Sequence, residues 1–355
     1  MKSPHGLVLL ALIALAVPLF ADSPEYPVGA TVPAPAPGHR QGLAAATDGL
    51  DFLVVWADFR TPGHGAIMGT RVKRSGQVVD PLGIRIASQP AAMSWPAVVW
   101  DGAAYVVVWT QGIYYGESLQ REEVWAARLD RDGRILTAPR LISEAGLLAT
   151  TTSGVYAASN GGVTVIAYRN FLLTGSVRIA VLDGQCNVIG RVSLPNASPD
   201  LARGMSVAAT STGFVLTWGT NDRKLFATIL GADGRFIRMP VQIGDGEDPV
   251  VATDGTSVML LWRHWMEDIS KWVLLSRKAD AELAAIGFVQ TLADDQSIEW
   301  PSALWRGDRY EVIAGQQSST QTRIYPYGLL SVEVDRDGNK RVSSRRGDPL
   351  DNGTV

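Results

Sequence analysis

Two kinds of side chain in this sequence have the chemistry to hold a polar ligand that contains a ring: paired tryptophans and grouped carboxylates. The phrases MSWPAVVWDG, at residues 93–102, and IEWPSALWRG, at residues 298–307, each place Trp-Pro ahead of a short apolar stretch and a second Trp. An indole face stacks on flat apolar groups such as one side of a sugar ring. Trp95 and Trp300 are therefore candidates for an aromatic platform. The alternative is that each indole packs over its Pro as part of the core.

Carboxylates are concentrated in two segments, GDGEDP at 244–249 and ADDQSIEW at 293–300. In the repeat described below, these segments are consecutive connections between units. A pair of carboxyl groups at the right separation can cleave a glycosidic bond, and a group of carboxylate oxygens can bind calcium. The alternative is that these are ordinary solvated acids, because charged side chains mostly stay exposed. The acids are Asp245, Glu247, Asp248, Asp294, Asp295 and Glu299, with Glu267 and Asp268 in the segment between the two.

Other motifs argue against a metal or a nucleophile. DRDG, at residues 130 and 335, is similar to a calcium loop, but the third acid of that loop is missing and a hairpin turn explains the motif better. His39, His64 and His264 stand in separate segments without metal-ligand spacing or a Ser-His-Asp arrangement. We therefore expect no cofactor, with calcium as the alternative.

A repeat must position these residues. Six apolar runs recur at spacings of 44 to 59 residues, and a Gly or, once, a Ser stands three residues before each. Because both faces of each run are apolar, each is typical of a strand covered on both sides. The runs are FLVVW (Phe52–Trp56), YVVVW (Tyr105–Trp109), TVIAY (Thr164–Tyr168), FVLTW (Phe214–Trp218), VMLLW (Val258–Trp262) and YEVIA (Tyr310–Ala314).

Each unit reads as four short antiparallel strands. A short apolar strand such as Ala97–Trp100 leads through a turn, often Asp-Gly, into the apolar run. A third strand, a second turn such as DRDG, and a fourth strand complete the unit. Four strands in about 50 residues without a helix describe one blade of a β-propeller. We predict an all-β fold, a six-bladed β-propeller of four-stranded antiparallel blades, with seven blades as the alternative.

The pattern resembles the repetitive β-propellers of exported, mostly uncharacterised bacterial proteins, whose blades show Asp-Gly, an aromatic residue, an apolar run and Trp. The resemblance covers Ala44 to about Val342 and implies a fold without an activity. The Asp-box of sialidases, the YWTD repeat and the paired glycines of kelch repeats are missing from the sequence, so the roles of those families do not carry over.

Strand direction separates two rims of the predicted ring. The short turns lie on one rim, and the long irregular segments lie on the other, where ligands usually bind. We place the candidate ligand site on the irregular rim, at the mouth between the fifth and sixth blades, with Trp95 as the matching residue of the second blade. The site residues are Trp95, Arg263, His264, Trp265, Asp294, Asp295, Glu299 and Trp300.

The N-terminal residues predict export. Lys2 and His5 precede an apolar run from Leu7 to Phe20, which is typical of a signal peptide cleaved near Ala21. We therefore expect a secreted or periplasmic protein. The expected divisions are a signal peptide over 1–21, a Pro-rich segment over 22–43 that closes the ring as an outer strand of the last blade, the propeller over 44–345, and a tail over 346–355.

Charge and cysteine content limit the partners. Cleavage removes one Lys and no acid, so the net charge moves from -3 to -4 (31 basic against 35 acidic residues), and no basic cluster is present to bind nucleic acid. Cys186 is the only cysteine, which excludes an intrachain disulfide. We expect a monomer, away from the membrane after cleavage, that presents a loop-rich rim to a carbohydrate or protein ligand. We favour such a binding module over the alternative, a polysaccharide-acting hydrolase or lyase that uses the rim carboxylates.

Overall fold

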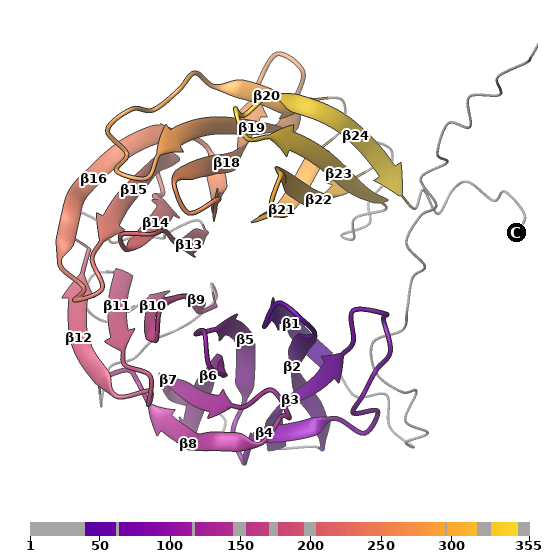
Figure 1. Ribbon diagram of the computed structural model, residues 1–355, viewed down its shortest axis with the longest axis vertical. Helices are drawn as coiled ribbons and strands as arrows, with labels where there is room; N and C mark the ends of the chain where they lie inside the picture. Colours follow the sequence, from indigo (N-terminus) through magenta and orange to yellow (C-terminus); the bar gives the residue numbers. More distant parts are fainter. Residues whose placement is uncertain are drawn as a thin grey trace, which may run out of the picture.

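The computed structural model describes residues 40–61, 64–115, 118–144, 154–169, 177–194, 204–294, 297–317 and 328–346. Their regular secondary structure is entirely β, with 24 strands in six sheets of four. Each sheet is formed by four strands consecutive in the chain, and each strand is antiparallel to the next. Figure 1 shows the sheets arranged around a central axis, with the first strand of each innermost and the fourth outermost. The predicted all-β, six-bladed architecture is confirmed.

The strands run as follows. Blade one contains β1 (Arg40–Thr47), β2 (Phe52–Thr61), β3 (His64–Val72) and β4 (Ile84–Gln89), and blade two contains β5 (Met93–Trp100), β6 (Tyr105–Tyr115), β7 (Ser118–Leu129) and β8 (Ile135–Leu141). Blade three contains β9 (Tyr156–Asn160), β10 (Val163–Arg169), β11 (Val177–Leu182) and β12 (Val188–Ser193), and blade four contains β13 (Met205–Ala209), β14 (Phe214–Gly219), β15 (Lys224–Leu230) and β16 (Phe236–Asp245). Blade five contains β17 (Glu247–Thr253), β18 (Ser257–Met266), β19 (Lys271–Asp280) and β20 (Gln290–Ala293), and blade six contains β21 (Ser297–Trp305), β22 (Arg309–Gln317), β23 (Gly328–Asp335) and β24 (Lys340–Arg346).

The apolar runs form the second strand of every blade. In blade two, the two faces of the run pack against two different neighbouring blades. Val107 and Trp109 pack into one cluster with Val55 of blade one. Val106 and Val108, which point the other way, pack with Ile166 of blade three. Burial on both faces explains why these strands are continuously apolar rather than alternating. Trp109, Trp218 and Trp262 are among the largest fully buried side chains of the described residues.

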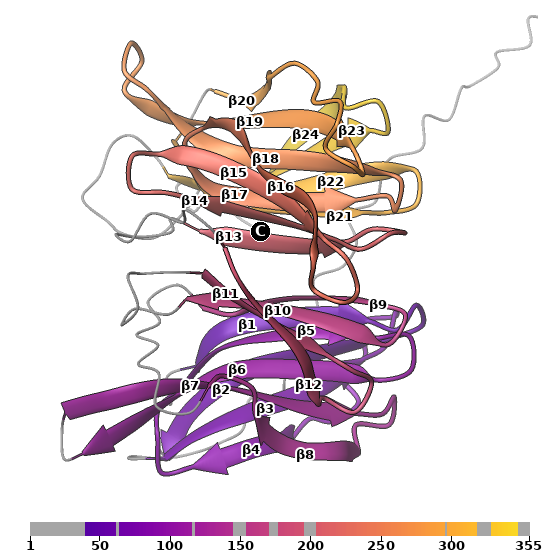
Figure 2. The same cartoon turned by 90° about the vertical axis from the view of Figure 1, so that its left-hand side faces the viewer.

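The strand directions separate the two rims as the sequence predicts. Figure 2 shows the molecule from the side, where β6 and β7 extend past the other strands at the rim that carries the irregular loops. These two strands have 11 and 12 residues, whereas the other second and third strands have between 6 residues, as in β14, and 10 residues, as in β18. The Asp-Gly turns lie at the opposite rim because they join first strands to second strands.

The turn rim carries two matching contacts between neighbouring blades. Asp48 of blade one pairs with Arg131 of blade two at 3.0 Å, and Asp254 of blade five pairs with Arg336 of blade six at 2.9 Å. Arg131 and Arg336 are the second residues of the two DRDG turns. They also lie over Trp100 and Trp305, at 4.9 and 5.7 Å from the ring centroids. The second Trp of each repeated phrase therefore belongs to a structural contact, and DRDG is a turn that supplies an arginine to the preceding blade.

The first and last blades are not joined in the described part of the chain. The innermost strands contact one another in the order β1, β5, β9, β13, β17 and β21, but no comparable contact links β21 back to β1. Figure 1 shows the two blades apart. Apolar side chains on their facing strands are accordingly exposed, including Leu43 at 73% and Leu304 at 50%.

The expected ring-closing segment is only partly described. Residues 40–43 of that segment begin β1, the innermost strand of the first blade, and residues 22–39 lie outside the described residues. The place expected for this segment, the outermost strand of the last blade, is taken by β24 from the C-terminal end of the chain. Residues 1–21, the predicted signal peptide, also lie outside the described residues. No helix in the described ranges is long and apolar enough to cross a bilayer.

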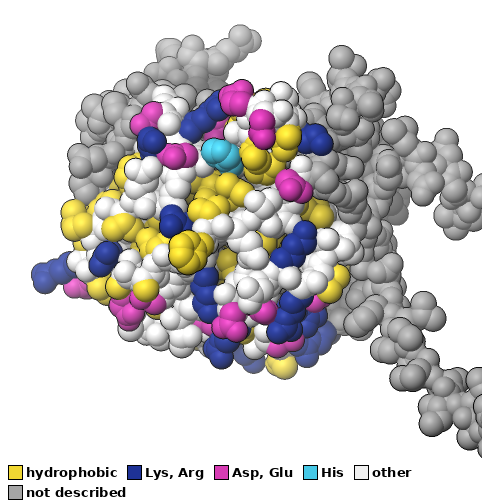
Figure 3. Space-filling model, turned by 90° about the horizontal axis from the view of Figure 1, so that it is seen from above, with side chains coloured by type: hydrophobic (Ala, Val, Ile, Leu, Met, Phe, Trp, Pro, Cys, Tyr) yellow, Lys and Arg dark blue, Asp and Glu magenta, His cyan; other side chains and the backbone are white. Residues whose placement is uncertain are grey.

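The outer edge of the ring has a mixed surface. Figure 3 looks from above onto the side of the ring that carries the fifth and sixth blades, where hydrophobic side chains lie exposed among Lys, Arg, Asp and Glu. Phe288, between β19 and β20, is 97% exposed. On this side, charges of both signs are interspersed and neither sign forms a continuous field.

Candidate functional site

One backbone feature recurs where each innermost strand begins, on the irregular rim. A residue with positive φ stands at this position in all six blades: Gly42 (61°), Trp95 (50°), Gly154 (77°), Gly204 (78°), Asp248 (51°) and Trp300 (44°). In four blades the register of the first two strands shifts at this residue, which forms a β-bulge. The six residues therefore mark one equivalent position around the mouth of the ring.

These residues approach their neighbours closely. A Cβ atom added to Gly42 would lie 3.0 Å from Cδ of Pro96 and 3.1 Å from Cα of Trp95, and one added to Gly154 would lie 3.4 Å from Cβ of Trp95. Trp95 thus lies between the glycines of the two adjacent blades. Likewise, a Cβ atom added to Gly204 would lie 2.9 Å from Cα of Asp248. Glycine at this position in blades one, three and four makes room for the larger residues of the neighbouring blades.

Trp95 and Trp300 hold an unfavourable backbone and expose their side chains. Bulky residues rarely adopt positive φ, and the following Pro restricts the backbone further. Such strain costs on the order of 1 to 3 kcal/mol per residue and clusters at ligand-binding sites. The side chains are nevertheless 45% and 61% exposed, so neither indole is buried as a packing residue.

The position of the Trp-Pro pairs differs from the sequence prediction. The sequence predicts a first strand, such as Ala97–Trp100, that follows the Trp-Pro pair, but β5 begins at Met93 and β21 at Ser297, ahead of both pairs. The bulge explains the difference. The pairing between the first and second strands leaves out the residues between Ser94 and Ala97 and those between Glu299 and Ser302. Each Pro lies in one of these unpaired stretches, where the sheet needs no backbone N–H donor.

Arg263 is the charged centre of the mouth between the fifth and sixth blades. Its Nη2 lies 2.7 Å from Oδ2 of Asp248 and 3.6 Å from Oε2 of Glu247, and its Nη1 donates to the carbonyl of Ile298 at 3.3 Å. Its guanidinium also lies 4.6 Å from the ring centroid of Trp272. Arg263 therefore ties the first strand of blade five to the segment of blade six that carries Glu299 and Trp300.

The remaining predicted residues are more scattered. Trp265 packs edge-on against Trp272, with 5.5 Å between ring centroids, at the end of the β18–β19 hairpin. Nδ1 of His264 lies 2.9 Å from the carbonyl oxygen of Asp245. Asp294 is exposed just after β20, the outermost strand of its blade, and has no contact with the mouth among the described residues. Asp295 lies outside the described residues.

Sequence reasoning missed two parts of this cluster. Trp272 supplies the aromatic face beneath Arg263, and Arg223 of blade four lies 5.7 Å from the same ring and 3.3 Å from Glu247. Glu247 is 5% exposed, although its segment reads as solvated loop acids. Neither partner shares a motif with the acids, and only the order of the blades brings them together. When the repeat units are aligned, Gly42, Gly154 and Gly204 stand where two other units have the Trp of a Trp-Pro pair. Because glycine readily adopts positive φ, this alignment is a sequence signal for left-handed backbone at that position.

Three acids of this rim form ion pairs with cations. Glu247 and Asp248 face Arg263, and Asp245 pairs with Lys224 at 2.8 Å. Within the described ranges, His, Cys, Asp and Glu form no group of three or more that could hold a metal ion. In the DRDG turns, Asp130 and Asp335 accept hydrogen bonds from backbone N–H groups of their own turns. The geometry therefore favours recognition of polar groups by a fixed set of ion pairs.

The comparisons with known proteins bear on the fold. No family model matches the chain, and no curated protein matches it in sequence. Among solved structures it is similar to a prolyl endopeptidase, with TM-score 0.51 and 12% identity over 86% of this chain and 42% of that chain. It is similar to a subtype N10 neuraminidase-like protein of A/little yellow-shouldered bat/Guatemala, with TM-score 0.50 and 9% identity over 87% and 95% of the two chains. A fucose-recognising fungal lectin from Aleuria aurantia, described as a six-bladed β-propeller, matches with TM-score 0.49 and 10% identity over 89% and 98%. At identities this low, the similarity shows the fold alone.

Proposed function

We propose that this protein is an exported binding module whose irregular rim holds a carbohydrate, or a protein surface, at the mouth of the propeller. The observation that carries the proposal is the pair Trp95 and Trp300, whose exposed indoles stand on left-handed backbone at equivalent positions of blades two and six. Strain of this kind persists where a binding surface requires it. An indole face gives a ring-shaped ligand apolar contact area and leaves its hydroxyl groups to neighbouring polar side chains.

The polar side chains near Trp300 suit a neutral or zwitterionic polar ligand. Arg263 and Asp248 form an ion pair, which fixes the orientation of both side chains before a ligand binds. Their remaining donor and acceptor atoms therefore point in fixed directions. Glu299 adjoins Trp300 in the chain and is half-buried. An aromatic face beside donors and acceptors of fixed direction is typical of sites that bind sugars through stacking and hydrogen bonds.

The alternative of a polysaccharide hydrolase or lyase has weaker support. Catalysis by two carboxyl groups needs both to face the substrate, one as an acid and one as a base or nucleophile. Glu247 and Asp248 both face Arg263, and Glu247 also pairs with Arg223, so two cations balance the two carboxylates. Neither is free to approach a glycosidic oxygen without breaking that pair. The arrangement therefore favours binding over bond cleavage.

A glycan array probed with the full chain tests the proposal, followed by affinity measurements on any hit. Trp95→Ala and Trp300→Ala should each weaken binding about tenfold, the effect of losing roughly 1.4 kcal/mol of stacking energy. Phe288→Ala is the matched control, because it removes an exposed aromatic side chain between β19 and β20, on the outer edge of blade five. Binding that survives both Trp substitutions, or release of shortened sugars from the bound glycan, would contradict the proposal.

A further inference from the structure

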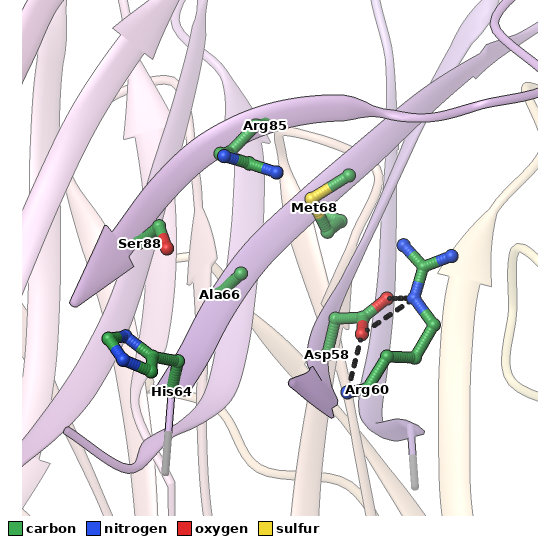
Figure 4. A pocket seen from close by; sticks show the side chains of 7 residues that line it. All are labelled: Asp58, Arg60, His64, Ala66, Met68, Arg85 and Ser88. Carbon is green, nitrogen blue, oxygen red and sulfur yellow. Dashed lines mark hydrogen bonds and ion pairs between the residues drawn. The ribbon is translucent and has the colours of Figure 1, made fainter. Parts of the chain in front are cut away.

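A cavity of about 460 Å³ lies on one face of the first blade, and none of its lining residues is one of the mouth residues described above (Figure 4). Its volume falls in the range of small-molecule sites, roughly 300 to 1,000 Å³. It is formed by β2, β3 and β4 rather than by the irregular loops. The lining residues are Asp58, Arg60, His64, Ala66, Met68, Arg85 and Ser88.

The strand register explains why these residues share one face. Asp58 pairs with Ala66, which pairs with Ser88, so one row crosses three strands. Met68, two residues after Ala66 on β3, pairs with Arg85 in a second row. A bulge on β4 between these rows skips one residue. Because of that bulge, Arg85 and Ser88 point to the same side although they are three residues apart.

Asp58 fixes Arg60 at the edge of the cavity. Its carboxylate accepts hydrogen bonds from the backbone N–H of Arg60 at 3.0 Å, from Nε of Arg60 at 2.9 Å and from Nε1 of Trp56 at 3.2 Å. Burial alone would raise the pKa of Asp58, but these hydrogen bonds outweigh it and hold the pKa below its ordinary value. Asp58 therefore remains a carboxylate, and it occupies the Nε side of the Arg60 guanidinium. Figure 4 shows the two terminal nitrogens of Arg60 on the far side from Asp58.

The cavity has a surplus of positive charge. Arg85 is exposed and makes no ion pair or hydrogen bond with any residue that the structure describes, so only one of the two guanidinium groups is balanced by a carboxylate. Figure 4 shows Met68 between the two arginines, with Ala66 next to His64 and Ser88 at the other end. Guanidinium groups bind carboxylate, sulfate and phosphate oxygens through paired hydrogen bonds. Ala66 and Met68 offer an apolar floor to the body that carries such a group.

We infer that this cavity binds a small organic anion, a carboxylate or sulfate group carried on a body with an apolar face. Arg85 and the terminal nitrogens of Arg60 hold the anionic oxygens, the hydroxyl of Ser88 adds a hydrogen bond, and the body lies on Ala66 and Met68. This site is separate from the mouth, and it does not depend on the proposed function.

Ligand-observed NMR titrations of the full chain test the site with four probes: glucuronate, glucose 6-sulfate, neutral glucose and inorganic sulfate. Glucuronate or glucose 6-sulfate should bind at least tenfold more tightly than glucose and than inorganic sulfate. Preference for the first of these two assigns a carboxylate ligand, and preference for the second assigns a sulfate ester. Arg85→Ala should weaken that binding at least tenfold. Arg134→Ala, which removes an exposed arginine on the turn rim of blade two, is the matched control and should leave it unchanged.

Three outcomes would overturn the inference. If glucose binds as tightly as the charged sugars, the anionic group has no role in recognition. If inorganic sulfate binds as tightly as the charged sugars, the organic body has no role. Binding unaffected by Arg85→Ala places the anion elsewhere. Trp300→Ala separates the two sites, because it should leave glucuronate binding intact. If Trp300→Ala abolishes that binding and Arg85→Ala does not, the cavity proposal fails while the mouth remains a ligand site.

Discussion

Arg336 forms an ion pair with Asp254 across the junction between the fifth and sixth blades, with 2.9 Å between Nε and Oδ2. The Asp254 carboxylate also accepts hydrogen bonds from the backbone N–H groups of Thr256 and Ser257, so it orders its own turn as well as the junction. Asp48 and Arg131 repeat the ion pair between the first two blades. The Asp of the Asp-Gly turn is therefore a junction residue in these two places.

We predict that Asp254→Ala lowers the free energy of unfolding by about 1 to 3 kcal/mol, because three donors lose hydrogen bonds to a charged acceptor whose side chain is only 1% exposed. Urea denaturation followed by tryptophan fluorescence measures the change. Asp308→Ala is the control, since its ion pair with Arg309 is formed by a side chain that is 63% exposed and should contribute little. Equal losses in the two variants would show that the junction contact has no special role.

Acid should destabilise the protein through these same carboxylates. Burial alone would raise the pKa of Asp254, but hydrogen bonds from Arg336, Thr256 and Ser257 outweigh it and hold the pKa well below its ordinary value of 3.8. The unfolded chain then binds this proton more readily than the folded chain, so stability from Asp254 is complete above about pH 5 and is lost as the pH falls below 3.8. Denaturation at pH 6 and pH 3 should therefore differ less in Asp254→Asn than in the unmodified protein. An identical pH dependence in the two proteins counts against this assignment.

Trp109→Ala should remove roughly 3 to 5 kcal/mol of stability, because Trp109 is fully buried between the first two blades. Phe288→Ala removes an aromatic side chain that is 97% exposed and should shift the melting temperature very little. Calorimetry of both variants tests the prediction. Comparable shifts would mean that the burial of the second strands is assigned incorrectly.

The two tryptophans of one repeated phrase should respond in opposite ways to glycine. Trp300→Gly relieves left-handed strain and should leave the stability unchanged or raise it by up to about 1 kcal/mol, while ligand binding at the mouth is lost. Trp305→Gly removes a ring that lies 4.7 Å from the Tyr310 centroid and beneath Arg336, and it should lower the melting temperature. A large loss of stability in Trp300→Gly would show that its indole is a packing residue.

Glycines at the mouth and at the turns should tolerate alanine differently. Gly204 and Gly255 both have positive φ, so alanine strains either position. At Gly204 the new Cβ also meets Cα of Asp248 at 2.9 Å, whereas at Gly255 it meets nothing within 4 Å. Gly204→Ala should therefore destabilise the protein more than Gly255→Ala does. Thermal unfolding of the two variants separates the contact from the backbone strain.

The repeat in the sequence was sufficient to predict the blades. An apolar run at intervals of 44 to 59 residues has one structural explanation, since a strand that is apolar on both faces must be covered twice. The rims follow from strand direction alone. The boundaries were less accurate, as in β5, which begins at Met93 rather than at Ala97, because the strand continues through the bulge at Trp95.

The geometry of the mouth needed the structure. A Trp before Pro at the edge of a strand suggests extended backbone, and only the bulge shows that Trp95 and Trp300 are left-handed. The pairing of Arg263 with Asp248 depends on a register shift between Glu247 and Val250, which no local pattern encodes. The cavity of blade one similarly depends on a bulge that turns Arg85 toward Ser88.

The assembly of each sheet from four consecutive strands has a kinetic consequence. Every described ladder joins strands that are neighbours in the chain, so the contacts within a blade have low sequence separation and form without closing long loops. The first blades can therefore fold on the ribosome before the last is synthesised. Because blades one and six each contact a single neighbour in the described structure, unfolding should begin at these ends and reach blades three and four last. Hydrogen exchange in such a molecule is fastest in the terminal blades, and the chain behaves as a curved linear array of folding units.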